Sequence, residues 1–133
     1  MRKSLDFKTK KLYAIQAVKW CRAFFGENER KRTKLSFEYT DRVRRIKQYE
    51  IFGNYCFYRN KITVHLVTCE TLSDIASTII HEYTHYLQSR NRYKYYQDRY
   101  YYSANPYERE ARRNEEKYTS KCVKDIRKAV SLQ

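Results

Sequence analysis

Apolar residues near the N-terminus recur at the spacing of one helix face. Between about Lys10 and Phe25 this stripe contains Leu12, Ile15, Val18, Cys21 and Phe25. Gly26 follows directly and is suited to end a helix. The pattern therefore predicts an N-terminal helix with one face in the core.

Between Lys34 and Val67 the pattern changes to short segments rich in aromatic and β-branched residues, at 35–39, 49–58 and 62–67. Such runs are typical of strands. Residues 59–61 form a plausible tight turn, so the last two segments are expected to pair as an antiparallel hairpin. Residues 42–47 are ambiguous. We expect 62–67 to be an edge strand beside a cleft, where an extended substrate could add as a further strand.

A second helix is predicted to begin at Thr71, with Asp74 at the capping-box position. Its apolar side contains Leu72, Ile75, Ala76, Ile79, Ile80, Tyr83, Tyr86 and Leu87. At about 100° per residue, His81 and His85 fall together on the opposite side. The two imidazoles are therefore expected to face whatever covers that side of the helix.

A third helix is expected after Asn105, a good cap, with Pro106 at the first helical position. Its apolar face contains Ala111, Tyr118, Cys122 and Ile126. Residues 89–104, dense in Tyr and Arg, give no clear pattern. We therefore expect an α+β fold in a single domain, 1–133, with an N-terminal helix, a small mostly antiparallel sheet and two further helices.

The amino-acid composition limits the kinds of chain and the cellular locations that we expect for this domain. Only two Gly and one Pro occur in 133 residues, which argues against a linker or a disordered tail. Residues 1–8 do not resemble a signal-peptide core and no run is long enough to span a membrane, so we expect a cytoplasmic protein without a membrane partner. The four cysteines, Cys21, Cys56, Cys69 and Cys122, contain no CxxC pair and are expected to be reduced.

The second helix carries an HExxH pentapeptide, His81-Glu82-Tyr83-Thr84-His85. On a helix this spacing places two imidazoles one turn apart, as two ligands of Zn²⁺. Glu82 lies between them, where a carboxylate can take a proton from an attacking water. These residues predict hydrolytic chemistry with one zinc ion per chain.

A catalytic zinc site needs a third protein ligand and an open position. No His follows His85, so a carboxylate is the expected third ligand, and Glu108 and Glu110 are the candidates. On the third helix Glu108 falls on the apolar face, whereas Glu110 falls on the far side with Asn114, Lys117 and Lys121. We therefore expect Glu108 to bind the metal, although closing a capping box with Asn105 would also explain it.

The pair of motifs HExxH at 81–85 and Glu108-Arg109-Glu110-Ala111 resembles the gluzincin-type zincin metallopeptidases. The chain looks most like their small intracellular and phage-encoded members of the ImmA/IrrE type. The resemblance covers about residues 62–118 and implies a zincin-like fold. It also implies zinc-dependent hydrolysis of an intracellular protein, in the cytoplasm or, for a viral protein, in that of the host. Those families often carry Asp or Asn four residues after the ligand Glu, where this chain has Arg112.

A second electrophile is usual in such sites, and a Tyr or Arg between Tyr93 and Tyr102 could serve. The remaining histidine, His65, is expected to pack or to lie at the surface rather than bind metal. The net charge of +14 and the mixing of Tyr with Arg and Lys in 90–102 leave an alternative open. In that alternative the chain is a nucleic-acid-binding module whose metal site is structural or vestigial.

Overall fold

A computed structural model describes residues 5–31 and 33–131. In chain order it contains α1 (Phe7–Phe25), β1 (Ser36–Thr40), β2 (Arg45–Ile46), β3 (Tyr49–Glu50), β4 (Gly53–Cys56), β5 (Lys61–His65), α2 (Leu72–Leu87), α3 (Arg90–Arg99), the short 3₁₀ helix η1 (Tyr102–Ala104) and α4 (Pro106–Ser131). The fold is therefore α+β, as expected. The prediction that no signal peptide is present rests on residues 1–8. Residues 1–4 of that segment lie outside the described residues.

Helix α1 begins three residues earlier than predicted because Asp6 caps it, accepting a hydrogen bond from the Thr9 backbone. It ends as expected at Gly26, whose positive φ of 81° suits glycine. The buried face differs from the prediction: Leu12 is 55% exposed, whereas Ala14, Ala17, Val18 and Cys21 are buried. The small alanines let α1 approach its neighbours closely, and a search for large apolar residues overlooked them.

The main sheet has three strands in the order β1-β5-β4. The predicted hairpin is confirmed, since β4 and β5 are antiparallel, but β1 pairs with β5 in parallel. The expectation of a mostly antiparallel sheet was therefore wrong, and the sheet is mixed. A segment's hydrophobic pattern does not reveal its direction relative to a strand far along the chain.

The prediction that 62–67 is an edge strand was also wrong. Strand β5 is central and has β1 on one side and β4 on the other, so the edge strand near α2 is β4. The ambiguous segment 42–47 enters a separate two-stranded hairpin, β2–β3, which projects from the body of the protein. His65 is buried and its Nδ1 lies 2.9 Å from the Arg42 carbonyl oxygen, which confirms a packing role.

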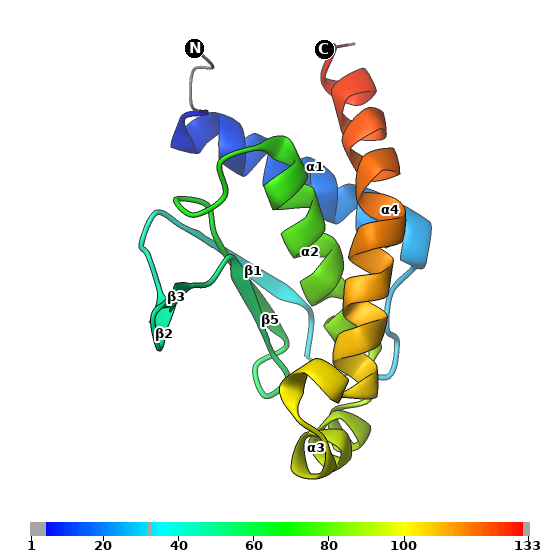
Figure 1. The fold of residues 1–133 in the computed structure, drawn as a ribbon. Helices are drawn as coiled ribbons and strands as arrows, with labels where there is room; N and C mark the ends of the chain where they lie inside the picture. Colours follow the sequence, from blue (N-terminus) through cyan, green and yellow to red (C-terminus); the bar gives the residue numbers. More distant parts are fainter. Residues whose placement is uncertain (1–4, 32, 132–133) are drawn as a thin grey trace.

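Helix α2 lies in the middle of the molecule, with the sheet on one side, α4 on the other and α1 crossing behind (Figure 1). The predicted capping box is present: the Thr71 hydroxyl accepts from Asp74 N–H, and the Asp74 carboxylate accepts from Thr71 N–H. Residues of α1, the sheet, α2 and α4 share one hydrophobic core. Packing on several sides fixes the position and rotation of α2.

The segment without a clear pattern folds into α3 and η1 and leads to α4. As predicted, the Asn105 side chain caps α4, accepting a hydrogen bond from Tyr107 N–H at 2.9 Å. Ala111, Cys122 and Ile126 are buried on the expected face. Within the described ranges no cysteine forms a disulfide and no helix is long and apolar enough to cross a membrane.

Candidate metal centre

Within the HExxH motif, Tyr83 and Thr84 anchor α2 to its neighbours and so fix where the other three side chains project. Tyr83 is fully buried in the core, and its hydroxyl donates to the Gly26 carbonyl oxygen. Thr84 is buried against α4, where its hydroxyl oxygen accepts from the Asn114 side chain at 3.1 Å. With these residues anchored, His81 and His85 project on one side of the helix, as the spacing predicts.

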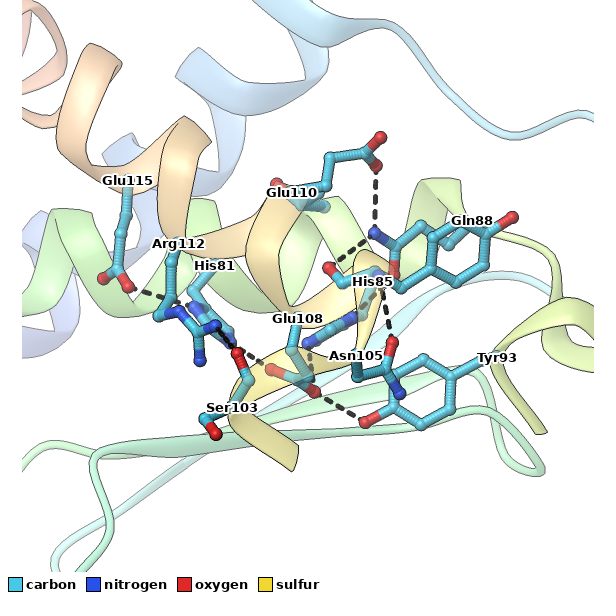
Figure 2. Close-up of polar contacts among 12 residues, drawn as sticks. His81, His85, Gln88, Tyr93, Ser103, Asn105, Glu108, Glu110, Arg112 and Glu115 are labelled. Carbon is cyan, nitrogen blue, oxygen red and sulfur yellow. Dashed lines mark hydrogen bonds and ion pairs between the residues drawn. The ribbon is translucent and has the colours of Figure 1, made fainter. Parts of the chain in front are cut away.

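Helix α4 brings Glu108 to the same place. The Glu108 carboxylate lies between the two imidazoles (Figure 2): Oε2 is 3.2 Å from His81 Nε2, and Oε1 is 3.1 Å from His85 Nε2. One potential ligand atom from each residue lies within 4.8 Å of the others. The three predicted ligands therefore converge, and they are close enough to hold a metal ion.

Each imidazole is oriented through its other nitrogen. His81 Nδ1 lies 3.1 Å from a Glu115 carboxylate oxygen, and His85 Nδ1 lies 2.7 Å from Gln88 Oε1. The Gln88 amide nitrogen donates to Tyr107 O and to Glu110, which leaves Oε1 as the acceptor facing His85. Both Nδ1 atoms therefore act as donors, and both Nε2 atoms are directed at the shared site.

Glu115 was not recognised as part of the site from the sequence. Arg112 occupies the position where the resembled families often carry a supporting Asp or Asn, but its guanidinium donates to Ser103 O instead. Glu115 lies about two turns after Glu108 on the same helix face and provides the carboxylate for His81. The periodicity that selected Glu108 also selects Glu115, so this signal was present in the sequence.

Glu110 does not join the ligand group, as predicted, and it is exposed. The prediction that Glu110 and Asn114 lie on the side of α4 away from the site was wrong. The Glu110 carboxylate accepts a hydrogen bond from Gln88, and the Asn114 amide donates one to Thr84, so both side chains face α2. The contact between α2 and α4 extends further round α4 than its apolar stripe indicates, and polar side chains provide its margin.

Two tyrosines from the unassigned segment border the site. The Tyr93 hydroxyl donates to Glu108 Oε1 at 2.5 Å, and its ring packs edge-on against His85. Tyr102 lines the same cleft from η1. Desolvation in the cleft, together with the nearby Glu108 charge, raises the pKa of both phenols, although Tyr102 is still 67% exposed, so both remain protonated donors at neutral pH.

Glu82 lies beside the ligand group without belonging to it. It is only 6% exposed, and no hydrogen bond from residues 5–31 or 33–131 reaches its carboxylate. Burial, which outweighs the opposing charges of His81 and His85, raises the pKa of this carboxyl group. Glu82 is therefore a buried acid whose side chain lines the cleft and is free to contact a bound molecule.

The carboxylates of the site favour a positive charge beside them, although the protein as a whole is strongly basic. Burial alone would lower the pKa of His81, but the hydrogen bonds to Glu108 and Glu115 outweigh it and raise the pKa to about 10. Burial alone would raise the pKa of Glu108, but hydrogen bonds from His81, His85 and Tyr93 lower it well below its usual value. In the protein without metal, a proton on His81 is thus stabilised where a metal ion could replace it.

The centre opens into a cleft of about 1350 Å³. One end is formed by the β2–β3 hairpin, one wall by β4, and the other end by the face of α3 that carries Arg90, Tyr93, Lys94 and Gln97. Strand β4 runs very close to α2: a Cβ atom on Gly53 would lie 2.5 Å from Thr78 Cγ2 and 3.5 Å from Glu82 Cγ. Glycine at this position lets the strand pass directly beside Glu82.

No protein-family model, curated protein or solved structure matches this chain. The chemistry of the centre therefore has to be inferred from its own residues.

Proposed function

We propose that the protein is a zinc-dependent metallopeptidase in which His81, His85 and Glu108 bind the metal. The observation that carries the proposal is the convergence of these three side chains beside Glu82, a buried carboxylate without a hydrogen-bond partner among the described residues. Two imidazoles, one carboxylate and an adjacent acid form the His₂Glu arrangement of catalytic zinc sites.

The donor set supports zinc as the metal. Imidazole nitrogens and a carboxylate oxygen are the usual protein ligands of catalytic zinc. Each Nε2 atom lies within 3.2 Å of an oxygen of the same carboxylate, and one potential ligand atom of each residue lies within 4.8 Å of the others. These three residues would therefore hold a zinc ion.

Glu82 has the role of general base in this proposal. A bound zinc ion would supply Lewis acidity, lowering the pKa of water and polarising the peptide carbonyl. Glu82 would take the proton from the attacking water and deliver it to the leaving amine. Tyr93 and Tyr102 both line the cleft beside the centre, so either phenol could donate to the developing charge on the carbonyl oxygen.

The free edge of β4 supports a peptide as the substrate. The Phe52 carbonyl oxygen accepts from His65 N–H, so at a period of two Asn54 and Cys56 also bond toward β5. The backbone groups of Gly53 and Tyr55 then point to the open edge, beside Glu82. An extended peptide could add there as a further strand, which replaces the expectation that it adds at 62–67.

The order of elements also supports the resemblance to the gluzincin-type zincins. A helix, a small sheet, the HExxH helix and a helix with the ligand Glu follow one another along the chain. In this proposal the substrate is an intracellular protein and the enzyme acts in the cytoplasm, or in that of the host for a viral protein.

The function is tested by Glu82→Gln with a fluorescently labelled unfolded protein as substrate. We expect cleavage by the zinc-loaded protein, and about a 10²–10⁴-fold loss in the variant. Zinc content should stay at one per chain, because Glu82 is not a ligand. Glu116→Gln, an exposed neighbour of Glu115, is the matched control and should retain activity. Equal cleavage by Glu82→Gln and the parent would exclude this mechanism.

The outer side of α3 favours a second candidate function, the binding of single-stranded nucleic acid. The Arg99 guanidinium lies 3.7 Å from the centre of the Tyr95 ring, and both side chains are exposed. Aromatic rings can stack on unpaired bases while arginines contact phosphates. Affinity for a single-stranded oligonucleotide should then fall steeply with salt concentration. A flat salt dependence would exclude this function.

A further inference from the structure

The two ends of the cleft differ in charge. At the hairpin end the lining residues include Lys47 but also Glu50, which pairs with Arg45 at 2.8 Å, and Asp74. At the α3 end they include Arg90 and Lys94 and no carboxylate apart from those of the metal centre. Among the residues that line the cleft, positive side chains are therefore in excess only at the α3 end.

The two cations at the α3 end are available to a ligand. Arg90 and Lys94 are exposed, and within the described chain neither forms an ion pair with a carboxylate. The Arg90 guanidinium lies 5.2 Å from the centre of the ring of Tyr58, two residues after the end of β4. With Tyr93 and Gln97 they follow the i, i+3, i+4, i+7 spacing, so this face of α3 is directed at the cleft.

The α3 end also corresponds to one end of a bound peptide. Phe57, just after β4, packs against Tyr93 of α3 with ring centres 4.8 Å apart. A peptide added to β4 in the antiparallel sense, the slightly more stable pairing, has its N-terminal half beside the C-terminal end of β4. That half would lie against Arg90 and Lys94.

We propose that the α3 end of the cleft is an acidic-residue subsite. Arg90 and Lys94 bind Asp or Glu side chains on the N-terminal side of the bond to be cleaved. The assignment of N-terminal and C-terminal sides rests on the proposed peptidase function. The substrate class is then an extended protein segment with acidic residues before the cleavage site.

The test measures peptide binding to full-length, zinc-loaded Glu82→Gln protein, so that binding is separated from cleavage. Two fluorescent peptides of identical composition are compared, one with its glutamates in the N-terminal half and the other with them in the C-terminal half. We expect the first to bind about tenfold more tightly, the effect of a few partly exposed charge pairs. The Arg90→Ala/Lys94→Ala double variant should remove this difference.

A matched control is Arg92→Ala/Arg99→Ala, which removes two arginines from α3 that do not line the cleft. It should leave the preference intact. Tighter binding of the C-terminal isomer, an unchanged preference in the Arg90/Lys94 variant, or no binding of either peptide would each overturn the proposal. So would tight binding of a single-stranded oligonucleotide through Arg90 and Lys94 with no preference between the peptides.

Failure of the peptidase function has a different signature. If the parent protein cleaves neither peptide but the binding preference and its loss in the double variant persist, the acidic subsite remains and the hydrolytic function is wrong. If both peptides are cleaved and bound equally, the hydrolytic function remains and the subsite is wrong.

Discussion

Helices α2 and α3 face the same cleft but are held in it in different ways. Eleven of the 16 residues of α2 are buried, whereas none of the ten residues of α3 is buried. Helix α2 contacts α1, α4, β4 and β5, and its start is fixed by a capping box. Helix α3 is held by aromatic contacts, Tyr93 with Phe57 and Tyr96 with Tyr107, and by the hydrogen bond from Tyr93 to Glu108.

The difference indicates how the proposed functions are divided. Metal ligands must hold their geometry within a fraction of an ångström, and a helix packed on several sides provides this rigidity. Charges that recognise a substrate at a rim tolerate movement and are more readily carried by an exposed element. The well-packed helix α2 thus carries ligands of the proposed metal site, and the exposed helix α3 carries the charges that would select the substrate.

The largest expected effect is on the free energy of unfolding, which should fall much more for a substitution on α2 than for one on α3. Ile79→Ala removes a fully buried side chain of α2 and should lower the free energy of unfolding by about 2–5 kcal/mol. Tyr95→Ala on the exposed side of α3 should change it by less than about 0.5 kcal/mol. Urea denaturation of both variants measures the contrast. Equal losses would show that α3 is as integral to the core as α2.

The contact between β4 and α2 provides a sharper test of how the cleft is built. Gly53→Ala should lower stability by about 1–3 kcal/mol, because the new Cβ would lie 2.5 Å from Thr78 Cγ2. Adding Thr78→Ser, which removes that methyl group, should restore part of the loss, although the Thr63 carbonyl oxygen remains 3.1 Å away. Thr78→Ser alone is the control. A stable Gly53→Ala protein would mean that β4 lies further from α2 than the structure has it.

A smaller effect is expected from the residue that orients His81. Glu115→Ala should weaken zinc binding about 10–100-fold, because the imidazole loses the acceptor at its Nδ1. Glu116→Ala, its exposed neighbour, should leave zinc affinity unchanged. Competition with a zinc-binding dye measures both. Equal zinc affinities of the Glu115→Ala and Glu116→Ala proteins would show that Glu115 does not support metal binding.

The contrast between α2 and α3 also explains what the sequence could predict. The caps Thr71 and Asn105 and the turn after β4 are local features, so they were recognised correctly. The histidine pair and Glu108 followed from helical periodicity, and the same rule, applied one step further, would have found Glu115. Local signals were enough for these caps, for the turn and for the ligand group, but they did not identify the buried alanine face of α1.

Features that depend on contacts between distant parts of the chain were harder to predict from the sequence. The parallel pairing of β1 with β5, which makes β4 the edge strand, depends on contacts across more than twenty residues of chain. Helix α3 has no apolar stripe because none of its residues is fully buried, so periodicity gave no signal for it. The role of Tyr93 depends on the placement of that helix and could be narrowed only to a range of candidates.

The most direct test of the central claim is the zinc content of the purified protein and of two variants on α4. The parent and Glu110→Ala should each contain one zinc ion per chain, and Glu108→Ala should contain little or none while remaining folded by circular dichroism. Full zinc occupancy in folded Glu108→Ala, or loss of zinc in both variants alike, would contradict a centre built from His81, His85 and Glu108.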